Sequence, residues 1–98
     1  MISILKALAN QKRFELLEWL KEPEKHFPQQ SCGAETEGEV CVGLIEKKLG
    51  LSQSTASKYL AELQRAGLVT ARRHGQWTFY RYNQTQIDSF MQELKQKI

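Results

Sequence analysis

The sequence predicts a mainly α-helical domain with one small β-hairpin, and three observations lead to this fold class. Gly50 can adopt the left-handed conformation that ends a helix, and Ser52 can cap the next helix, so two helices are joined by a tight turn. Two runs of β-forming residues then follow within residues 68–82, separated by a turn that contains glycine. The chain length suffices for one hydrophobic core. Together these features predict a single winged helix-turn-helix domain over residues 1–98.

The N-terminal segment, residues 1–20, has apolar residues at an approximately helical spacing, with a polar interruption at residues 10–13. This pattern predicts one bent helix or two short helices. Residues 22–39 contain prolines and glycines and show little periodicity, which predicts a long loop and a candidate sensory segment. Helical spacing returns over residues 42–49, which predicts the first helix of the helix-turn-helix.

The second helix is predicted from Ser52 to about Ala66. Ala56, Leu60 and Leu63 fall on one face at i, i+4 and i+7, so this face is expected to pack against the core. The opposite face is small, polar and basic, which lets a helix enter the roughly 12 Å wide major groove of DNA and offer donors to base edges. A helix hairpin in an ordinary bundle would more often place long Glu and Lys side chains there. The residues expected to read the groove are Gln53, Ser54, Thr55, Ser57 and Lys58.

The β-hairpin is predicted from residues 68–73 and 76–82, with the turn at His74-Gly75. Successive strand residues point to opposite faces of a sheet. We assign the alternating set that includes Tyr80 to the core and the set that includes Phe79 to the outer face, because tyrosine hydroxyls can reach solvent at the edge of a core. Polar and basic side chains near the turn are expected to contact DNA phosphates or the minor groove. They are Arg72, Arg73, His74 and Gln76.

Positive charge is concentrated on the same part of the chain. The formal net charge is +3, but residues 52–82 hold five basic residues and a single acid, Glu62, which gives this segment +4 and leaves −1 for the rest. A basic segment that coincides with a candidate recognition helix is the electrostatic pattern expected of a phosphate-binding face.

The C-terminal segment carries a narrow apolar stripe on an otherwise polar helix. The stripe consists of Ile87, Phe90, Met91, Leu94 and Ile98. It is too long to be covered by so small a core, and Ile2, Leu5 and Leu8 at the other chain end offer a matching surface. We therefore expect a two-fold homodimer built from both chain ends.

At residues 52–60, Ser-Gln-Ser-Thr-Ala-Ser-Lys-Tyr-Leu, and at residues 72–77, Arg-Arg-His-Gly-Gln-Trp, the chain resembles the ArsR/SmtB family of bacterial winged-helix repressors. The order of the elements, residues 5–17, the exit Ala-Gly-Leu-Val at residues 66–69 and the remainder of the wing at residues 78–82 are similar to that family as well. The resemblance implies a homodimer joined through the first and last helices, which places two recognition helices in successive major grooves of an inverted-repeat operator. It also implies repression that is relieved by a metal ion, a metalloid or a thiol oxidant.

The chain departs from the family at its metal sites. Members that sense arsenite or soft metals often carry Cys-Val-Cys where this chain has Cys41-Val42-Gly43, and a second family site needs histidines that residues 84–98 lack. The remaining candidates are Cys32 and Cys41, with His26 as a further ligand, for a soft or borderline metal ion or metalloid. Two other interpretations stay open: the cysteines form a redox pair, or they are unrelated structural residues.

Other classes of protein are disfavoured by the sequence. It has no Gly-rich phosphate loop, no paired carboxylates in an apolar setting and no serine with an activating histidine, so we expect no enzyme and no certain cofactor. It has neither an apolar run of about 18 residues nor an evident signal peptide, so we expect a cytoplasmic protein without a membrane partner. Two alternatives remain: a winged-helix module that binds proteins, and a DNA-binding regulator without a metal or redox response.

Overall fold

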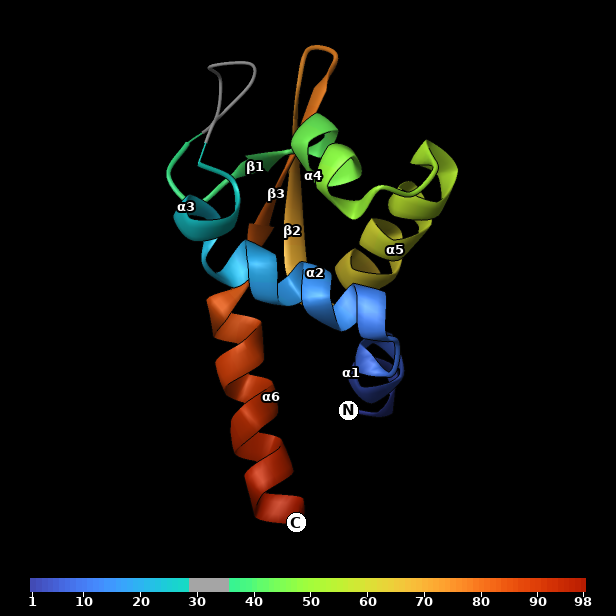
Figure 1. Cartoon of the computed structure of the whole chain (residues 1–98). Helices are drawn as coiled ribbons and strands as arrows, with labels where there is room; N and C mark the ends of the chain where they lie inside the picture. Colours follow the sequence, from blue (N-terminus) through green and yellow to red (C-terminus); the bar gives the residue numbers. More distant parts are fainter. Residues whose placement is uncertain (29–35) are drawn as a thin grey trace.

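The computed structural model describes residues 1–28 and 36–98, and it has an elongated shape of 42 × 26 × 24 Å. Within these residues the helices are α1 (Ile2–Leu8), α2 (Gln11–Lys21), α3 (Pro23–His26), α4 (Val42–Leu49), α5 (Gln53–Arg65) and α6 (Gln84–Lys97). The strands are β1 (Val40–Cys41), β2 (Val69–His74) and β3 (Trp77–Tyr82), in the antiparallel order β1-β3-β2. The tip of the β2-β3 hairpin lies at one end of the molecule, and α1 and α6 extend toward the other (Figure 1).

The N-terminal segment forms two helices, which decides between the two predicted alternatives. Asn10 lies between them, and its side-chain oxygen accepts a hydrogen bond of 3.0 Å from the backbone N–H of Arg13. An asparagine in this position satisfies one of the N–H groups that the first turn of a helix leaves without a partner. α1 therefore ends before Asn10, and Asn10 begins α2 at the predicted polar interruption.

The prediction of one long loop over residues 22–39 is wrong at its N-terminal end, whereas its C-terminal end agrees with the start of β1 at Val40. Pro23 starts the four-residue helix α3, at the first helical position where its missing N–H costs nothing. Phe27 follows and is buried, with its ring 6.3 Å from that of Trp19 in an edge-on arrangement. At the other end, Val40 begins β1 and pairs with Tyr80. Both elements are too short to produce a periodic pattern.

The helix-turn-helix follows the prediction closely. Gly50 ends α4 with φ of 66°, and the hydroxyl of Ser52 accepts a hydrogen bond of 3.3 Å from the backbone N–H of Thr55. The three residues predicted for the inner face of α5 have no exposed surface; they are Ala56, Leu60 and Leu63. They belong to a core that α2 crosses, in contact with α1, α3, α5 and β3.

The hairpin is confirmed, but its turn is shifted by one residue. His74 pairs with Trp77, so the turn residues are Gly75 and Gln76 rather than His74 and Gly75. Gly75 has φ of 61° and is the residue of this turn in the positive-φ region. Glycine is favoured at the first turn position of a hairpin for this reason, which sets the register one residue later than predicted.

The assignment of the outer face of β3 is partly wrong. Tyr80 and Tyr82 pack against the core as predicted, but Phe79 on the opposite face is fully buried. The guanidinium carbon of Arg72 lies 4.8 Å from the centre of the Phe79 ring, and Cys41 pairs with Phe79 from the other side. Phe79 is therefore buried on the face that alternation alone leaves to solvent, because β3 is the middle strand of the sheet and the Arg72 side chain lies over its ring.

The segment that follows α5 is hydrogen-bonded directly to the start of α6. Asn83 is the single residue between β3 and α6, and its side-chain nitrogen donates a hydrogen bond of 2.8 Å to the carbonyl oxygen of Gly67. Its backbone N–H donates to the carbonyl oxygen of Leu68 at 3.0 Å, and its side-chain oxygen caps α6. Three hydrogen-bonding groups of one residue thus hold the exit of α5 against α6.

Candidate nucleic-acid interface

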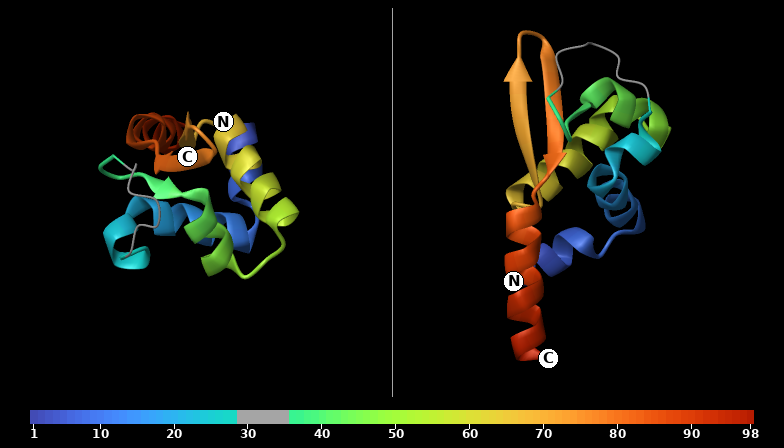
Figure 2. Two further views of the ribbon diagram at one scale, coloured as in Figure 1. Left: turned by 90° about the horizontal axis from the view of Figure 1, so that it is seen from above. Right: turned by 90° about the vertical axis from the view of Figure 1, so that its left-hand side faces the viewer.

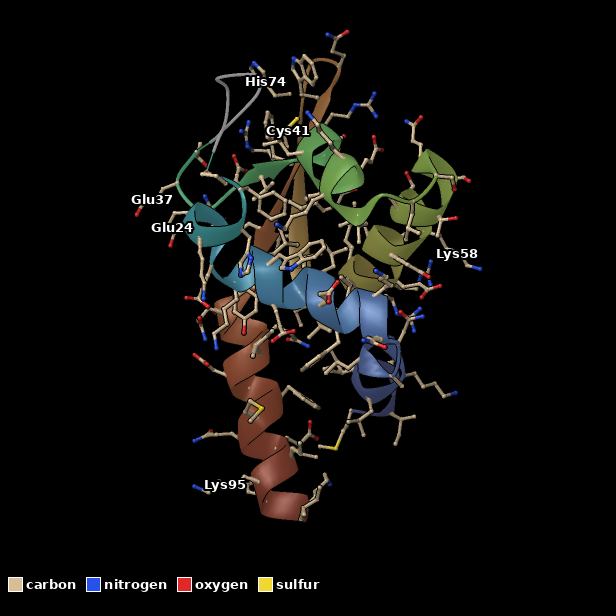
Figure 3. All side chains as sticks on the ribbon, in the orientation of Figure 1. Glu24, Glu37, Cys41, Lys58, His74 and Lys95 are labelled. Carbon is tan, nitrogen blue, oxygen red and sulfur yellow. The ribbon has the colours of Figure 1, made fainter. Side chains whose placement is uncertain are left out.

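The first two turns of α5 present most of the predicted groove-reading residues to solvent. Gln53, Ser54, Ser57 and Lys58 are exposed, and Lys58 points away from the body of the molecule in Figure 3. Thr55 is half-buried, and its hydroxyl accepts a hydrogen bond of 2.9 Å from the hydroxyl of Ser52, so part of its bonding capacity serves the helix cap. The exposed surface is otherwise polar and carries no bulky side chain.

The tip of the hairpin holds three of the four predicted wing residues. Arg73, His74 and Gln76 are exposed, and His74 lies at the outer end of the hairpin in Figure 3. The Nε atom of Arg73 donates to the carbonyl oxygen of Gly75 at 3.4 Å, which keeps its guanidinium near the turn. The views in Figure 2 place this tip at the same end of the molecule as α4 and opposite to α6.

Arg72 has a different environment from its neighbours. It forms a two-pronged ion pair with Glu39, in which its Nε donates to Oε2 at 2.8 Å and its Nη2 donates to Oε1 at 2.7 Å. The side chain of Glu39 is 6% exposed and also accepts a hydrogen bond of 2.8 Å from the backbone N–H of Thr36. The hydrogen bonds from Arg72 lower the pKa of Glu39 to about 2, against the opposing effect of burial.

Arg81 also forms hydrogen bonds within the molecule. Its Nη2 donates to the hydroxyl of Thr36 at 2.8 Å and to the carbonyl oxygen of Glu37. Two of the five basic residues counted in the segment 52–82 thus contact the short stretch before β1. Sequence reasoning missed Glu39 as the partner of Arg72, because it lies 33 residues from Arg72 and was counted among the acids of a loop.

The candidate metal ligands are not brought together in the described part of the chain. Cys41, labelled in Figure 3, is fully buried at the N-terminus of α4, and it forms no disulfide with any described residue. His26 lies on α3, with its ring 6.4 Å from that of Trp19. Cys32 lies outside the described residues. Among residues 1–28 and 36–98, no three His, Cys, Asp or Glu side chains form a group that could hold a metal ion.

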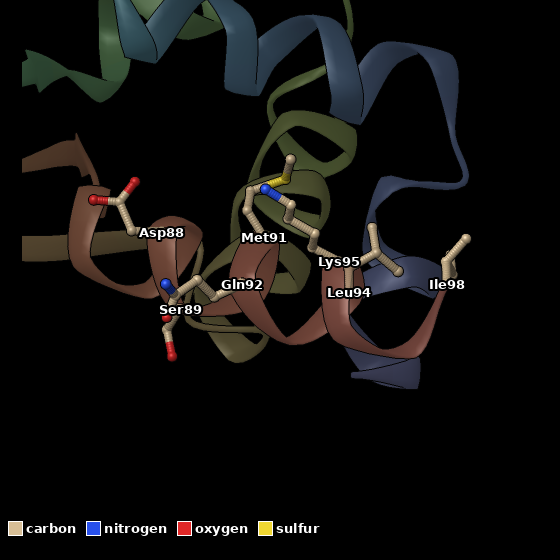
Figure 4. Close-up of a pocket in the computed structure, with 7 residues that line it drawn as sticks. All are labelled: Asp88, Ser89, Met91, Gln92, Leu94, Lys95 and Ile98. Carbon is tan, nitrogen blue, oxygen red and sulfur yellow. The ribbon is translucent and has the colours of Figure 1, made fainter.

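The far end of the molecule exposes apolar side chains on two helices. Met91 on α6 and Ile98 just after it are 55% and 95% exposed, and Ile2 on α1 is 64% exposed. An open groove runs along α6 between Asp88 and Ile98, with Met91 and Leu94 in its wall (Figure 4). Phe90, in contrast, is buried in the core of its own chain. The predicted stripe is thus divided between an inner part that this chain covers and an outer part that it leaves exposed.

None of the helices in the described ranges has both the length and the apolar character needed to cross a membrane.

Residues 35–71 match the bacterial regulatory proteins of the arsR family. The chain is also 45% identical over 98 residues to the uncharacterized HTH-type transcriptional regulator YbzH of Bacillus subtilis, across 99% of this chain and 97% of that protein. This chain belongs to the arsR family. It is 32% identical over 93 residues to the transcriptional activator HlyU of Vibrio cholerae, across 95% of this chain and 72% of HlyU.

Solved structures of arsR-family regulators share the fold. The solution structure of the homodimeric winged helix-turn-helix DNA-binding domain Mb0332 from Mycobacterium bovis, described as a possible ArsR-family regulator, aligns with a TM-score of 0.66 and 29% identity. The alignment covers 96% of this chain and 73% of that one. This arsR-family chain is therefore a winged helix-turn-helix transcriptional regulator rather than an enzyme.

Proposed function

We propose that this regulator is a homodimeric repressor that binds an inverted-repeat operator in double-stranded DNA. The observation that carries the proposal is the exposed polar start of α5, on the same molecule as an exposed basic hairpin tip. A helix of this kind fits the major groove, and a basic hairpin beside it can reach the flanking backbone or minor groove. Repression is the action of the ArsR/SmtB proteins that residues 52–60 and 72–77 resemble.

The contacts divide into two groups in this proposal. Base edges are read by Gln53, Ser54, Thr55, Ser57 and Lys58. Phosphates or the minor groove are contacted by Arg73, His74 and Gln76. Contacts of the first kind specify a sequence, whereas those of the second kind position the protein.

The dimer is supported by the exposed apolar side chains on α1 and α6. Ile2, Met91 and Ile98 would lose their contact with water if two copies met about a two-fold axis. The same end of the molecule carries both chain termini, away from the hairpin tip (Figure 1). In such a dimer both DNA-reading surfaces would face outward on one side, which an inverted repeat requires.

Binding can be tested with a fluorescent duplex recovered by selection from a randomised library and a mixed-sequence duplex of equal length. A DNA reader should prefer the selected duplex, and its affinity should fall by roughly one power of salt concentration per phosphate contacted. A wing that binds proteins instead would show neither preference nor slope. A promoter fusion carrying the selected site then tests repression: reporter output should fall when the protein is expressed, and a rise would identify an activator.

The signal proposed to release DNA acts through the cysteines. A soft metal ion, a metalloid or a thiol oxidant that acts through Cys32 and Cys41 would change the start of α4, because Cys41 is the residue that precedes that helix. The second candidate, a regulator without a metal or redox response, is favoured by the complete burial of the Cys41 side chain.

Titration with zinc, cadmium, arsenite and an oxidant distinguishes these two candidates. If the cysteines sense a signal, one of these four reagents should lower the affinity for the selected duplex. Cys32→Ser and Cys41→Ala should then each abolish this fall in affinity. Cys41→Ala is preferred to Cys41→Ser because a buried hydroxyl would lack a partner. An unchanged affinity, or the same response in both variants, would assign the cysteines a structural role.

A further inference from the structure

The Glu39–Arg72 ion pair crosses the whole sheet on its outer face. Glu39 immediately precedes β1, whereas Arg72 lies on β2, and β3 runs between these two strands. The guanidinium of Arg72 lies over Phe79 of that middle strand, 4.8 Å from the ring centre. The pair therefore fastens the two outer edges of the sheet together across an aromatic ring.

This connection joins the start of the helix-turn-helix to the hairpin that carries the wing contacts of the proposed function. Cys41, the last residue of β1, is followed at once by Val42, the first residue of α4. Arg72 is followed at once by Arg73, the first exposed residue near the hairpin tip. Fixing Glu39 to Arg72 thus fixes the start of the helix-turn-helix relative to the strand that carries the wing contacts.

A second set of hydrogen bonds strengthens the same connection. Thr36 donates its backbone N–H to Glu39 and accepts a hydrogen bond from Arg81 of β3. Arginines from both wing strands therefore hold residues 36–39, and Glu39 is their buried centre. The lowered pKa of Glu39 keeps this carboxylate ionised at neutral pH.

The wing needs such a connection, because a two-stranded hairpin is only marginally stable on its own in water. Each strand has six residues, so the hairpin is about 20 Å long at about 3.4 Å per residue. A tilt of about 10° at its base would move the tip by about 3 Å, which is enough to break a hydrogen bond to a phosphate.

We propose that Glu39 and Arg72 are positioning residues that hold the wing at the angle required for DNA binding, and that Arg72 itself neutralises no phosphate. This inference rests on the proposed DNA-binding function. It separates Arg72 from Arg73, which sequence reasoning had placed in one group.

The decisive variant is Glu39→Gln. A purely electrostatic effect of Glu39 and a positioning role for Glu39 predict changes of opposite sign in the affinity for DNA. Loss of a negative charge favours DNA binding if electrostatics alone matter, and it would also release Arg72 toward phosphates. Loss of the positioning contact should instead weaken binding. We expect Glu39→Gln to lower affinity for the selected duplex about tenfold with an unchanged salt slope. Equal or tighter binding, or a steeper salt slope, would overturn the proposal.

Variants of two arginines on the same strand provide the matched comparison. Arg73→Gln should lower the salt slope by about one, because it removes a phosphate contact. Arg72→Gln should lower affinity but leave the slope unchanged, and Arg72→Lys should recover only part of the affinity because lysine cannot form the two-pronged bond. If Arg72→Gln lowers the slope as Arg73→Gln does, Arg72 is a phosphate contact and the proposal is wrong.

A measurement without DNA keeps failure of this inference distinct from failure of the proposed function. Trp77 lies near the hairpin tip and is 38% exposed, and Trp19 is the other tryptophan of the sequence. In a Trp19→Phe background, the anisotropy decay of Trp77 reports motion of the wing. Glu39→Gln and Arg72→Gln should add a fast component that Arg73→Gln lacks, while circular dichroism confirms that all three variants are folded. Identical decays in all three would refute positioning, even if the parent protein binds no DNA at all.

Discussion

The Nη1 atom of Arg13 lies 2.6 Å from the Oε2 atom of Glu62, which joins the first turn of α2 to the recognition helix. The same guanidinium donates hydrogen bonds to the carbonyl oxygens of Ala7 at 2.7 Å and Lys6 at 3.1 Å, at the end of α1. It also lies 5.8 Å from the centre of the Tyr59 ring. One side chain therefore connects α1, which carries part of the exposed apolar surface, with the helix expected to enter DNA.

Replacement of Arg13 should destabilise the fold more than replacement of its acidic partner. Arg13→Ala loses the ion pair and both carbonyl contacts, so we expect a loss of roughly 2–4 kcal/mol, whereas Glu62→Gln should cost about 1 kcal/mol. Urea denaturation followed by circular dichroism measures both values. Equal losses in the two variants would mean that the contacts with α1 contribute nothing.

The dimer should depend on the outer part of the α6 stripe. Met91→Asp places a charge on a residue that is 55% exposed and has no role in the core, so it should produce a folded monomer. Gln96→Asp is the matched control, because this exposed residue lies outside the groove. Sedimentation at micromolar concentration compares the two variants with the parent protein. A parent protein that sediments as a monomer would contradict the proposed dimer.

Phe90→Asp is a poor test of the dimer, since Phe90 is buried in its own chain and its loss would unfold the protein.

Base reading by α5 should be separable from the stability of the helix. Gln53→Ala and Ser57→Ala should each reduce discrimination between the selected and mixed-sequence duplexes by about 1–3 kcal/mol, without a large change in unfolding. Ser52→Ala should do the reverse and cost about 0.5–2 kcal/mol of stability, because Ser52 caps the helix. A loss of stability without loss of discrimination in Gln53→Ala and Ser57→Ala would remove these residues from the interface.

The stability contributed by Glu39 should disappear in acid. Its pKa is lowered from 4.5 to about 2 in the folded protein, so the folded state binds the proton less readily than the unfolded chain. The stabilisation is complete above pH 4.5 and is lost as the pH falls from there toward 2. Parent and Glu39→Gln should therefore differ in free energy of unfolding at about pH 6, and the difference should shrink below pH 4.5 and vanish only as the pH reaches about 2. A difference that stays constant over this range would show that the carboxylate charge is irrelevant.

Local chemistry made the helix-turn-helix predictable. Gly50 and Ser52 act on the residues next to them, so the end of α4 and the start of α5 could be placed from sequence. The hairpin turn was missed by one residue, because two polar residues beside Gly75 satisfied the same pattern.

Contacts between distant residues made the remainder unpredictable. The burial of Phe79 depends partly on Arg72, and the position of Arg72 depends on Glu39, which is 33 residues away. No periodicity connects these positions. The five basic residues of segment 52–82 were therefore counted correctly, but not all of them offer their charge to DNA. Arg72 and Arg81 contact residues 36–39 instead.

The hydrogen bonds of Asn83 have a consequence for operator geometry. One residue separates β3 from α6, and this residue, Asn83, forms a 2.8 Å hydrogen bond with Gly67 just after α5. We therefore expect α5 to be held rigidly against α6 and unable to move when the distance between two bound half-sites changes. In a two-fold dimer, the separation of the recognition helices must then match one turn of B-DNA, about 34 Å, without adjustment by a linker. Operators with one base pair added or removed at the centre should be rejected almost as strongly as unrelated DNA, and Asn83→Gly, which loosens this joint, should make the protein more tolerant of such spacing.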